Sequence, residues 1–98
     1  MKGFADMDEN KIIITVSGTD KVGIIATISA VLAREGVNIE DVKQTLMQGH
    51  FVMFMLCDIT GATKSFKEIK NILIEAGNSM ELEVWVQKKG IFEKMHTV

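Results

Sequence analysis

The sequence has little of what several functional classes require. It contains one cysteine, Cys57, and no proline. A single cysteine can form neither an internal disulfide nor a CxxC metal or redox site, and it favours a reducing, cytoplasmic location. The chain also lacks internal repeats, low-complexity tracts and a proline-rich linker. Its 98 residues are therefore expected to fold as one domain.

Neither the charge nor the hydropathy of the sequence indicates a nucleic-acid-binding protein or a membrane-spanning one. Eleven basic residues stand against thirteen acidic ones, for a net charge of −2, whereas a nucleic-acid-binding surface needs concentrated basic charge. No apolar run approaches the roughly 20 residues that span a bilayer. Met1–Asp6 lacks the apolar core of a signal peptide. We expect residues 1–10 to be a disordered or leader segment, with Met7 as an alternative start.

Apolar side chains, in contrast, are abundant for so short a chain. They make up 47% of the sequence, and seven residues are methionines. A small domain has a large surface relative to its volume, so it cannot easily bury this much apolar area alone. Part of the apolar surface is therefore expected to form an interface between copies of the chain, although the methionines also suit a core.

The first third of the chain predicts a strand, a short loop and a helix. Residues 11–17 form a β-branched run that is typical of a strand. Apolar residues then recur with helical spacing from 22 to 35. Thr19 or Asp20 can cap the start of this helix, and Gly36 suits a left-handed exit at its end.

A hairpin is expected next. The weaker strand at 37–47 has an alternation that slips at Glu40–Asp41, which indicates a β-bulge. Gln48–Gly49 is a turn signal, so residues 51–59 should return as the partner strand. This third strand is apolar on both faces. It is therefore expected to be central in its sheet, with something covering each side.

The last third predicts a second helix and a fourth strand. Residues 63–76 carry an apolar stripe at helical spacing. Ser65 and Glu68 have the spacing of a capping box, and Gly77 is expected to end the helix. Residues 80–88 alternate between apolar and polar, as a half-buried strand does.

The resulting order is βαββαβ. It predicts an α+β, ferredoxin-like sandwich, with a four-stranded antiparallel sheet and both helices on one face. The strands at 11–17 and 51–59 should lie in the middle. The other sheet face has no predicted cover within the chain, which favours association through the sheet. The tail, 91–98, is expected to form one helical turn docked on the domain or on a dimer partner.

The loop from Gly18 to Gly23 is the candidate functional site. Unpaired N–H groups and a partial positive charge at a helix start suit an anion. Gly23 lets a ligand approach the backbone closely, and Asp20 can accept bonds from an ammonium group. Together these features suit a zwitterion, although most loops of this kind only reverse the chain.

Residues 14–26 and 32–39 resemble the corresponding segments of an ACT domain. The chain is most similar to short stand-alone ACT proteins of bacteria and archaea. That similarity rests on residues 44–53 (QTLMQGHFVM) and on 91–96 (IFEKMH). It extends over residues 11–98 and implies an ACT-like domain at 11–90.

This resemblance implies a regulatory module, not an enzyme, that senses a small amino acid at the interface of a homodimer or tetramer. It implies no cofactor or metal, and an unidentified protein effector. The ligand would contact the loop residues Thr19, Asp20, Lys21, Val22, Gly23 and Ile24. Asn38 and Ile39 would line the facing side, from a neighbouring subunit. Val22 departs from the family pattern, which has a proline there to pre-set the first helical turn.

A pure protein-interaction module without a ligand stays open as an alternative. An acylphosphatase-like hydrolase has the same element order but needs an arginine in the first loop. Here the only arginine is Arg34, and Lys21 cannot reproduce its planar fork. An RNA-binding sheet needs exposed aromatics on strand 11–17, which has none. His50 and His96 have no ligand partners at metal-site spacing.

Overall fold

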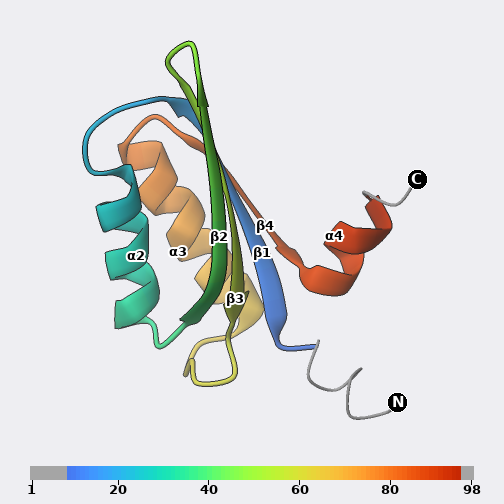
Figure 1. Ribbon diagram of the computed structural model, residues 1–98. Helices are drawn as coiled ribbons and strands as arrows, with labels where there is room; N and C mark the ends of the chain where they lie inside the picture. The colour runs from blue at the N-terminus through green and yellow to red at the C-terminus, as the bar shows by residue number, and fades with distance from the viewer. Residues whose placement is uncertain (1–8, 96–98) are drawn as a thin grey trace.

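The computed structural model describes residues 9–95 as four strands and three helices (Figure 1). The strands are β1 (Lys11–Thr19), β2 (Asn38–Met47), β3 (His50–Asp58) and β4 (Glu83–Lys88), and the helices are α2 (Ile24–Arg34), α3 (Phe66–Ser79) and α4 (Lys89–Met95). The predicted βαββαβ order is confirmed, with α4 added after β4. Residues 1–8 of the expected leader segment, 1–10, and the last three residues of the tail lie outside the described part of the chain.

The strands form one antiparallel sheet in the order β2-β3-β1-β4. The prediction that the first and third strands lie in the middle is therefore confirmed. So is the bulge in β2, because the register with β3 shifts between Ile39 and Asp41. The hairpin turn also forms as predicted. Gln48 and Gly49 both have positive φ, at 51° and 82°, which is the geometry of a tight two-residue turn.

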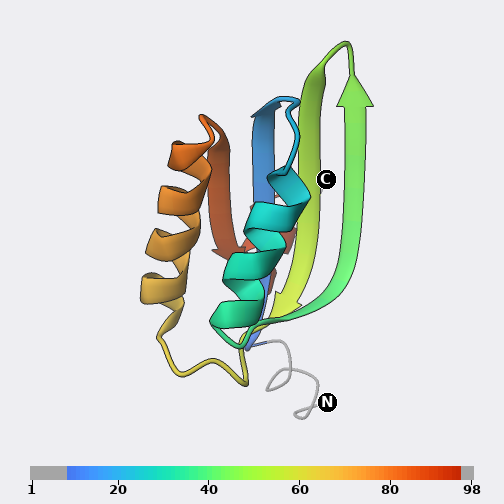
Figure 2. The same cartoon turned by 90° about the vertical axis from the view of Figure 1, so that its left-hand side faces the viewer.

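Helices α2 and α3 pack on the same face of the sheet, here called the inner face (Figures 1 and 2). The core lies between these helices and the alternate residues of the strands that point toward them. Its fully buried side chains are Ile12, Ile14, Val16, Ile28, Leu32, Met53, Met55, Cys57, Ile69, Leu73 and Val86. Most of the apolar residues identified by alternation and helical spacing are thus accounted for by one core.

The start of α2 differs from the prediction. The helix begins at Ile24 after an N-cap residue, Gly23, with φ of 93°, and no side chain caps it. Neither Thr19 nor Asp20 does so. Thr19 still belongs to β1, and the Asp20 N–H donates to the carbonyl oxygen of Gly49 at 2.8 Å. Both residues are therefore held by the sheet side of the loop.

The end of α3 also differs, since Gly77 does not terminate the helix. The helix continues to Ser79 and is capped at Met80, and the left-handed conformation falls on Glu81, with φ of 60°. A Cβ atom on Gly77 would lie 2.2 Å from Cγ2 of Val84. The glycine therefore lets α3 pack closely on β4. Because the turn extends past Met80, β4 begins later than predicted.

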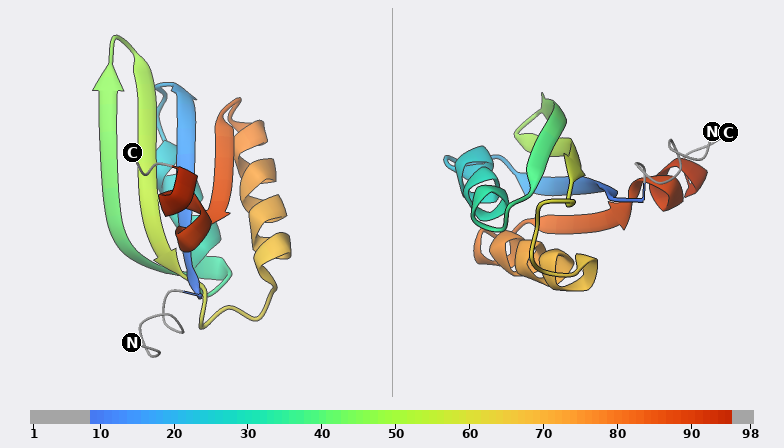
Figure 3. Two further views of the ribbon diagram at one scale, coloured as in Figure 1. Left: turned by 90° about the vertical axis from the view of Figure 1, so that its right-hand side faces the viewer. Right: turned by 90° about the horizontal axis from the view of Figure 1, so that it is seen from below.

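The outer face lies opposite α2 and α3, and the βαββαβ order predicted no cover for it within the chain. In the structure, helix α4 lies over part of this face (Figure 3). The Phe92 ring meets the Phe54 ring edge to face, with centroids 6.3 Å apart and planes at 62°. Phe54 and Trp85 nevertheless stay 42% and 49% exposed. Over residues 9–95, no helix has the length and apolar character to cross a membrane.

Candidate functional site

The loop between β1 and α2 is fastened at two points. The Asp20 N–H is bonded to Gly49 of the β2–β3 turn. The Lys21 ammonium group donates to the carbonyl oxygen of Met80, at the C-terminal end of α3, where the helix dipole favours a cation. Between these ties and the helix, Val22 is 99% exposed. The loop is thus anchored to both neighbouring elements while its tip faces solvent.

The first turn of α2 leaves backbone donors available. The first bond within the helix runs from the Thr27 N–H to the Gly23 carbonyl oxygen at 2.9 Å. The N–H groups of residues 24–26 precede it and have no acceptor inside a helix. No side chain caps them. Together with the positive end of the helix dipole, they form a site that can receive a carboxylate.

A pocket of 450 Å³ opens beside this turn. One wall comes from the loop and the first turn of α2, and the other comes from β2 and β3. Its lining residues are Asp20, Lys21, Gly23, Ile24, Ile25, Ala26, Gln44, Leu46 and Phe51. Gln44 and Leu46 pair with the buried residues Met53 and Phe51. Paired residues share a sheet face, so both point to the inner face.

The structure brings some of the predicted site residues together and separates others. Asp20, Lys21, Gly23 and Ile24 line the pocket. Thr19 ends β1 beside it, and Val22 projects away into solvent.

Asn38 and Ile39 lie at the other end of the sheet, opposite Asp58 and Cys57. Eight residue steps along β1 separate the two ends, or roughly 25 Å. Within one chain, Asn38 and Ile39 therefore cannot face the ligand that the loop would hold.

Five pocket residues were missed by sequence reasoning: Ile25, Ala26, Gln44, Leu46 and Phe51. Ile25 and Ala26 follow from the helix start, once that start is known. Gln44 and Leu46 come from a strand about 20 residues further on, and only the antiparallel register of β2 and β3 places them beside the loop. Two signals were available in the sequence: the family-like stretch 44–53, which contains three of these residues, and the apolar Leu46 on a predicted outer strand, which the structure leaves 58% exposed.

Strand β2 forms an open edge next to the pocket. It spans ten residues, and every residue in it except Ile39 is exposed. Figure 2 shows why, since α2 and α3 stand over the other strands and leave β2 uncovered. An edge strand presents a row of unpaired N–H and C=O groups that can pair with another strand.

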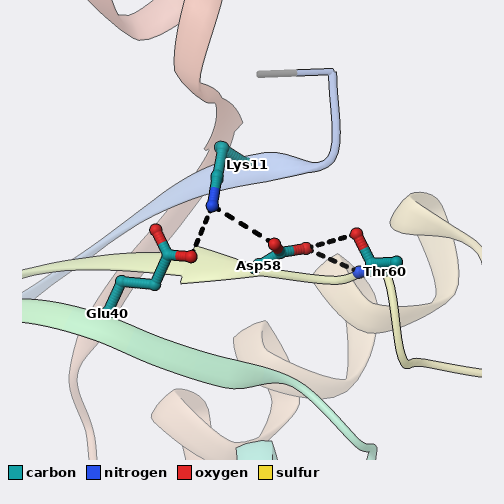
Figure 4. Close-up of polar contacts among 4 residues, drawn as sticks. All are labelled: Lys11, Glu40, Asp58 and Thr60. Carbon is teal, nitrogen blue, oxygen red and sulfur yellow. Dashed lines mark hydrogen bonds and ion pairs between the residues drawn. The ribbon is translucent and has the colours of Figure 1, made fainter. Parts of the chain in front are cut away.

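At the end of the sheet far from the pocket, charged and polar side chains form a cluster (Figure 4). The Lys11 ammonium group contacts the Glu40 carboxylate and lies 3.2 Å from Oδ2 of Asp58. Asp58 Oδ1 accepts bonds from the backbone N–H and the hydroxyl of Thr60, at 2.8 Å and 2.6 Å.

These contacts shift the pKa values of Asp58 and Lys11. The bonds from Thr60 lower the pKa of the Asp58 carboxyl. The bond to Glu40 raises the pKa of Lys11. Because Glu40 is the bulge residue of β2, this cluster ties the bulge to β1 and β3. No residue pattern predicted this cluster.

The described residues offer little for catalysis. Burial raises the pKa of the Cys57 thiol to about 12, so this cysteine is a poor nucleophile. The Ser17 hydroxyl lies 3.0 Å from Nε2 of His50 on the exposed outer face, away from the pocket. Within residues 9–95, no three histidine, cysteine, aspartate or glutamate side chains gather in a way that could hold a metal ion.

Comparison with known proteins points to one family. An ACT domain model matches residues 10–87. A UPF0237 protein of Clostridium acetobutylicum is 46% identical over 88 residues, which cover 90% of this chain and 99% of that protein. A UPF0237 protein of Methanocaldococcus jannaschii is 40% identical over 89 residues, which cover 91% and 99%.

A solved structure agrees with these sequence relatives. An ACT domain protein from Streptococcus pneumoniae superposes with a TM-score of 0.74 at 34% identity. The match covers 85% of this chain and 93% of that one. The family match at residues 10–87 includes the β1–α2 loop and the β2–β3 hairpin.

Proposed function

This chain belongs to the ACT domain family, as its resemblance predicted, and we propose that it binds a small amino acid at the β1–α2 loop of a homodimer. The observation that carries the proposal is the pocket beside the uncapped start of α2. It combines free helix N–H groups, the Asp20 carboxylate and an apolar wall in one space of 450 Å³. The role is regulatory, and the buried, lone Cys57 suits a reducing cytoplasm.

The pocket matches the two charges of an amino acid. The ligand carboxylate binds the N–H groups of residues 24–26, which the helix dipole reinforces. The ligand ammonium group binds Asp20, whose side chain is exposed at the pocket wall. Lys21 has a different role, because it holds the Met80 carbonyl oxygen and so fixes the loop. The ligand side chain lies toward Gln44 and Leu46.

Pairing of two copies through β2 brings Ile39 of the partner subunit to this pocket, with Asn38 next to it on the outer side of the strand. In a symmetric antiparallel pairing centred on β2, the first residues of one strand lie opposite the last residues of the other. The partner's Ile39 then lies near Leu46, which lines the pocket. A two-fold axis perpendicular to the sheet keeps both copies' helices on the same side, so inner-face residues meet inner-face residues. This explains how residues about 25 Å apart in one chain serve one site.

Such a site links ligand binding to assembly. A ligand held between two subunits binds the dimer and not the separated chains, so it stabilises the dimer by mass action. The gain is about 2.7 kcal/mol at 100 times the dissociation constant. The signal to an unidentified effector protein is then the assembly state or the shape of the paired β2 edge.

A thermal-shift screen with all twenty amino acids at millimolar concentration tests the proposal. We expect one or a few small amino acids to raise the melting temperature of the wild-type protein. The Asp20→Asn variant removes the ammonium partner and should lose that shift. The Glu75→Gln variant removes one exposed carboxylate from α3, away from the pocket, and should keep it.

Three results would count against the proposal. If no amino acid shifts the wild-type protein while sedimentation shows a dimer, the chain is an interaction module without a ligand. If Asp20→Asn and Glu75→Gln respond equally, the ligand binds elsewhere. A monomer at micromolar concentration, with and without amino acids, would remove the dimer site altogether.

A further inference from the structure

The outer face of the sheet is more apolar than a solvent-facing sheet surface should be. An antiparallel sheet with one wet face normally alternates apolar and polar residues. β3 breaks this rule, because Val52, Phe54 and Leu56 point outward while their neighbours fill the core. On the same face, Ile13 of β1 lies beside Leu56, and Trp85 of β4 lies opposite Thr15. Helix α4 covers only part of this surface.

A ridge and a groove lie side by side on the outer face. The ridge is α4, which stands out from the sheet (Figures 1 and 3) and carries Ile91, 55% exposed. The groove, of 320 Å³, lies between Phe92 and β2. Its apolar lining consists of Ile13, Val42, Phe54, Met55, Leu56 and Phe92. The charged residues Asp41 and Lys43 also border it.

We propose that a second copy of this chain docks on the outer face, with α4 of each copy seated in the groove of the other. A two-fold contact requires a surface that complements itself. An apolar ridge next to an apolar groove meets this requirement, because one rotation places each ridge over the opposite groove. The exposed apolar residues are then covered on both copies at once, without any foreign partner.

Area agrees with this occupant, and charge does not oppose it. Lys94, in the last turn of α4, has the charge opposite to that of Asp41 and the same as that of Lys43, and both of these residues border the groove. A stable interface buries about 800 Å² on each partner, which is a modest share of the 6334 Å² surface of the chain. One broad sheet face with α4 is large enough to supply it.

This contact meets the proposed pairing only at β2, whose Asp41, Val42 and Lys43 border the groove. It uses the outer face, whereas the ligand site lies on the inner face at the β2 edge. The two contacts can exist in the same assembly, which then contains four chains. The outer-face contact also stands if no ligand binds, because none of its residues belongs to the amino-acid pocket.

The only tryptophan of the chain, Trp85, reports on this face directly. It is half exposed on the outer side of β4, the strand at the opposite edge of the sheet from β2. We would follow tryptophan emission and sedimentation of the full chain through one dilution series. Docking on the outer face predicts a blue-shifted emission that moves to the red on dilution, at the same midpoint as the fall in mass.

One variant and one matched control sharpen the test. Ile91→Lys places a charge on the exposed side of α4 and should leave the fold intact. Two equivalent ridge contacts are lost in the two-fold complex, so the dissociation constant should rise by about 100-fold or more. Emission should then be red-shifted and the mass halved. Asn71→Lys adds the same charge on the exposed side of α3 and should behave as the wild type.

Other outcomes would overturn the proposal. A mass that falls on dilution while the emission stays constant would place the association elsewhere, as pairing through β2 alone would. A chain that stays monomeric at all concentrations, or an Ile91→Lys protein identical to the wild type in both readouts, would also reject it. Phosphatidylcholine vesicles serve as a further arm. A blue shift caused by vesicles, and by no rise in protein concentration, would assign the face to a lipid surface.

Discussion

The two helices that cover the sheet begin in opposite ways. Helix α3 begins at a complete capping box, in which the Ser65 hydroxyl accepts the Glu68 N–H at 3.2 Å and the Glu68 carboxylate accepts the Ser65 N–H at 2.9 Å. Helix α2 begins at Gly23 with no side-chain cap. Both helices pack on the same sheet face and belong to the same core.

This difference separates a structural end from a functional one. At α3 the capping box satisfies the N–H groups of Ser65 and Glu68 within the chain. At α2 the N–H groups of the first turn have no side-chain cap and lie beside a pocket that Asp20 also lines. A missing cap costs about 1 kcal/mol of stability. The domain caps α3 but not α2. The uncapped start of α2 is therefore where a ligand can take the place of a capping side chain.

The largest effect is expected at a glycine whose role is packing, not binding. In Gly77→Ala the new Cβ would lie 2.2 Å from Cγ2 of Val84, so α3 must move away from β4. We expect a loss of about 2 kcal/mol in unfolding free energy, measured by urea denaturation. The amino-acid response should survive. Its loss would mean that α3 packing, and not the α2 start alone, controls the site.

Gly23→Ala should have the next largest effect. Alanine must adopt a φ of 93°, which costs about 1–2 kcal/mol, and the start of α2 must shift to relieve it. The amino-acid-induced rise in melting temperature should disappear. Gly36→Ala is the matched control, because Gly36 has a φ of 74° at the other end of the same helix. It should lose stability yet keep the response, and equal loss in both variants would contradict a specific role for Gly23.

Removing the cap of α3 should cost stability without touching ligand binding. Ser65→Ala deletes the hydroxyl that accepts the Glu68 N–H, and a loss of about 1 kcal/mol is expected. Thermal or urea unfolding measures it. If amino-acid binding weakened as well, the two helix starts would not be independent, and the comparison between them would fail.

The smallest effect is a pH dependence confined to α3. The bond from the Ser65 N–H lowers the pKa of Glu68 below its ordinary value of 4.5. The charged carboxylate therefore stabilises the fold above pH 4.5, and this contribution is lost as the pH falls through the lower, folded-state pKa. Glu68→Gln keeps an acceptor but not the charge. The stability difference between wild type and variant should vanish on acidification, and a difference that persists at acid pH would contradict this cause.

Sequence patterns were sufficient to predict the fold because the fold depends on which side chains are buried. The two-faced β3 and the β-branched β1 were correctly placed in the middle of the sheet, and the capping box at Ser65 was visible from its spacing. Gly77 was misread because a glycine near a helix end suits both a left-handed exit and a close approach. Only the position of Val84 distinguishes the two.

The site was less accessible to sequence reasoning because it is assembled from distant segments. Asp20 and Gly23 were visible as a loop before a helix. Gln44 and Leu46 reach that loop only through the register of β2 with β3. The cap was misassigned because Thr19 and Asp20 have suitable side chains, whereas the backbone bond of Asp20 to Gly49 holds them at the sheet.

The most direct test of the ligand site is an amide titration by NMR, which a chain of 10.9 kDa allows. A ¹⁵N-labelled protein is titrated with the amino acid that gives the largest thermal shift. The N–H signals of residues 23–26 should move in a saturable way, together with those of Asn38 and Ile39, while those of residues 65–68 at the capped start of α3 stay in place. No movement at residues 23–26, or equal movement at both helix starts, would contradict the proposal that the uncapped end of α2 is the binding site.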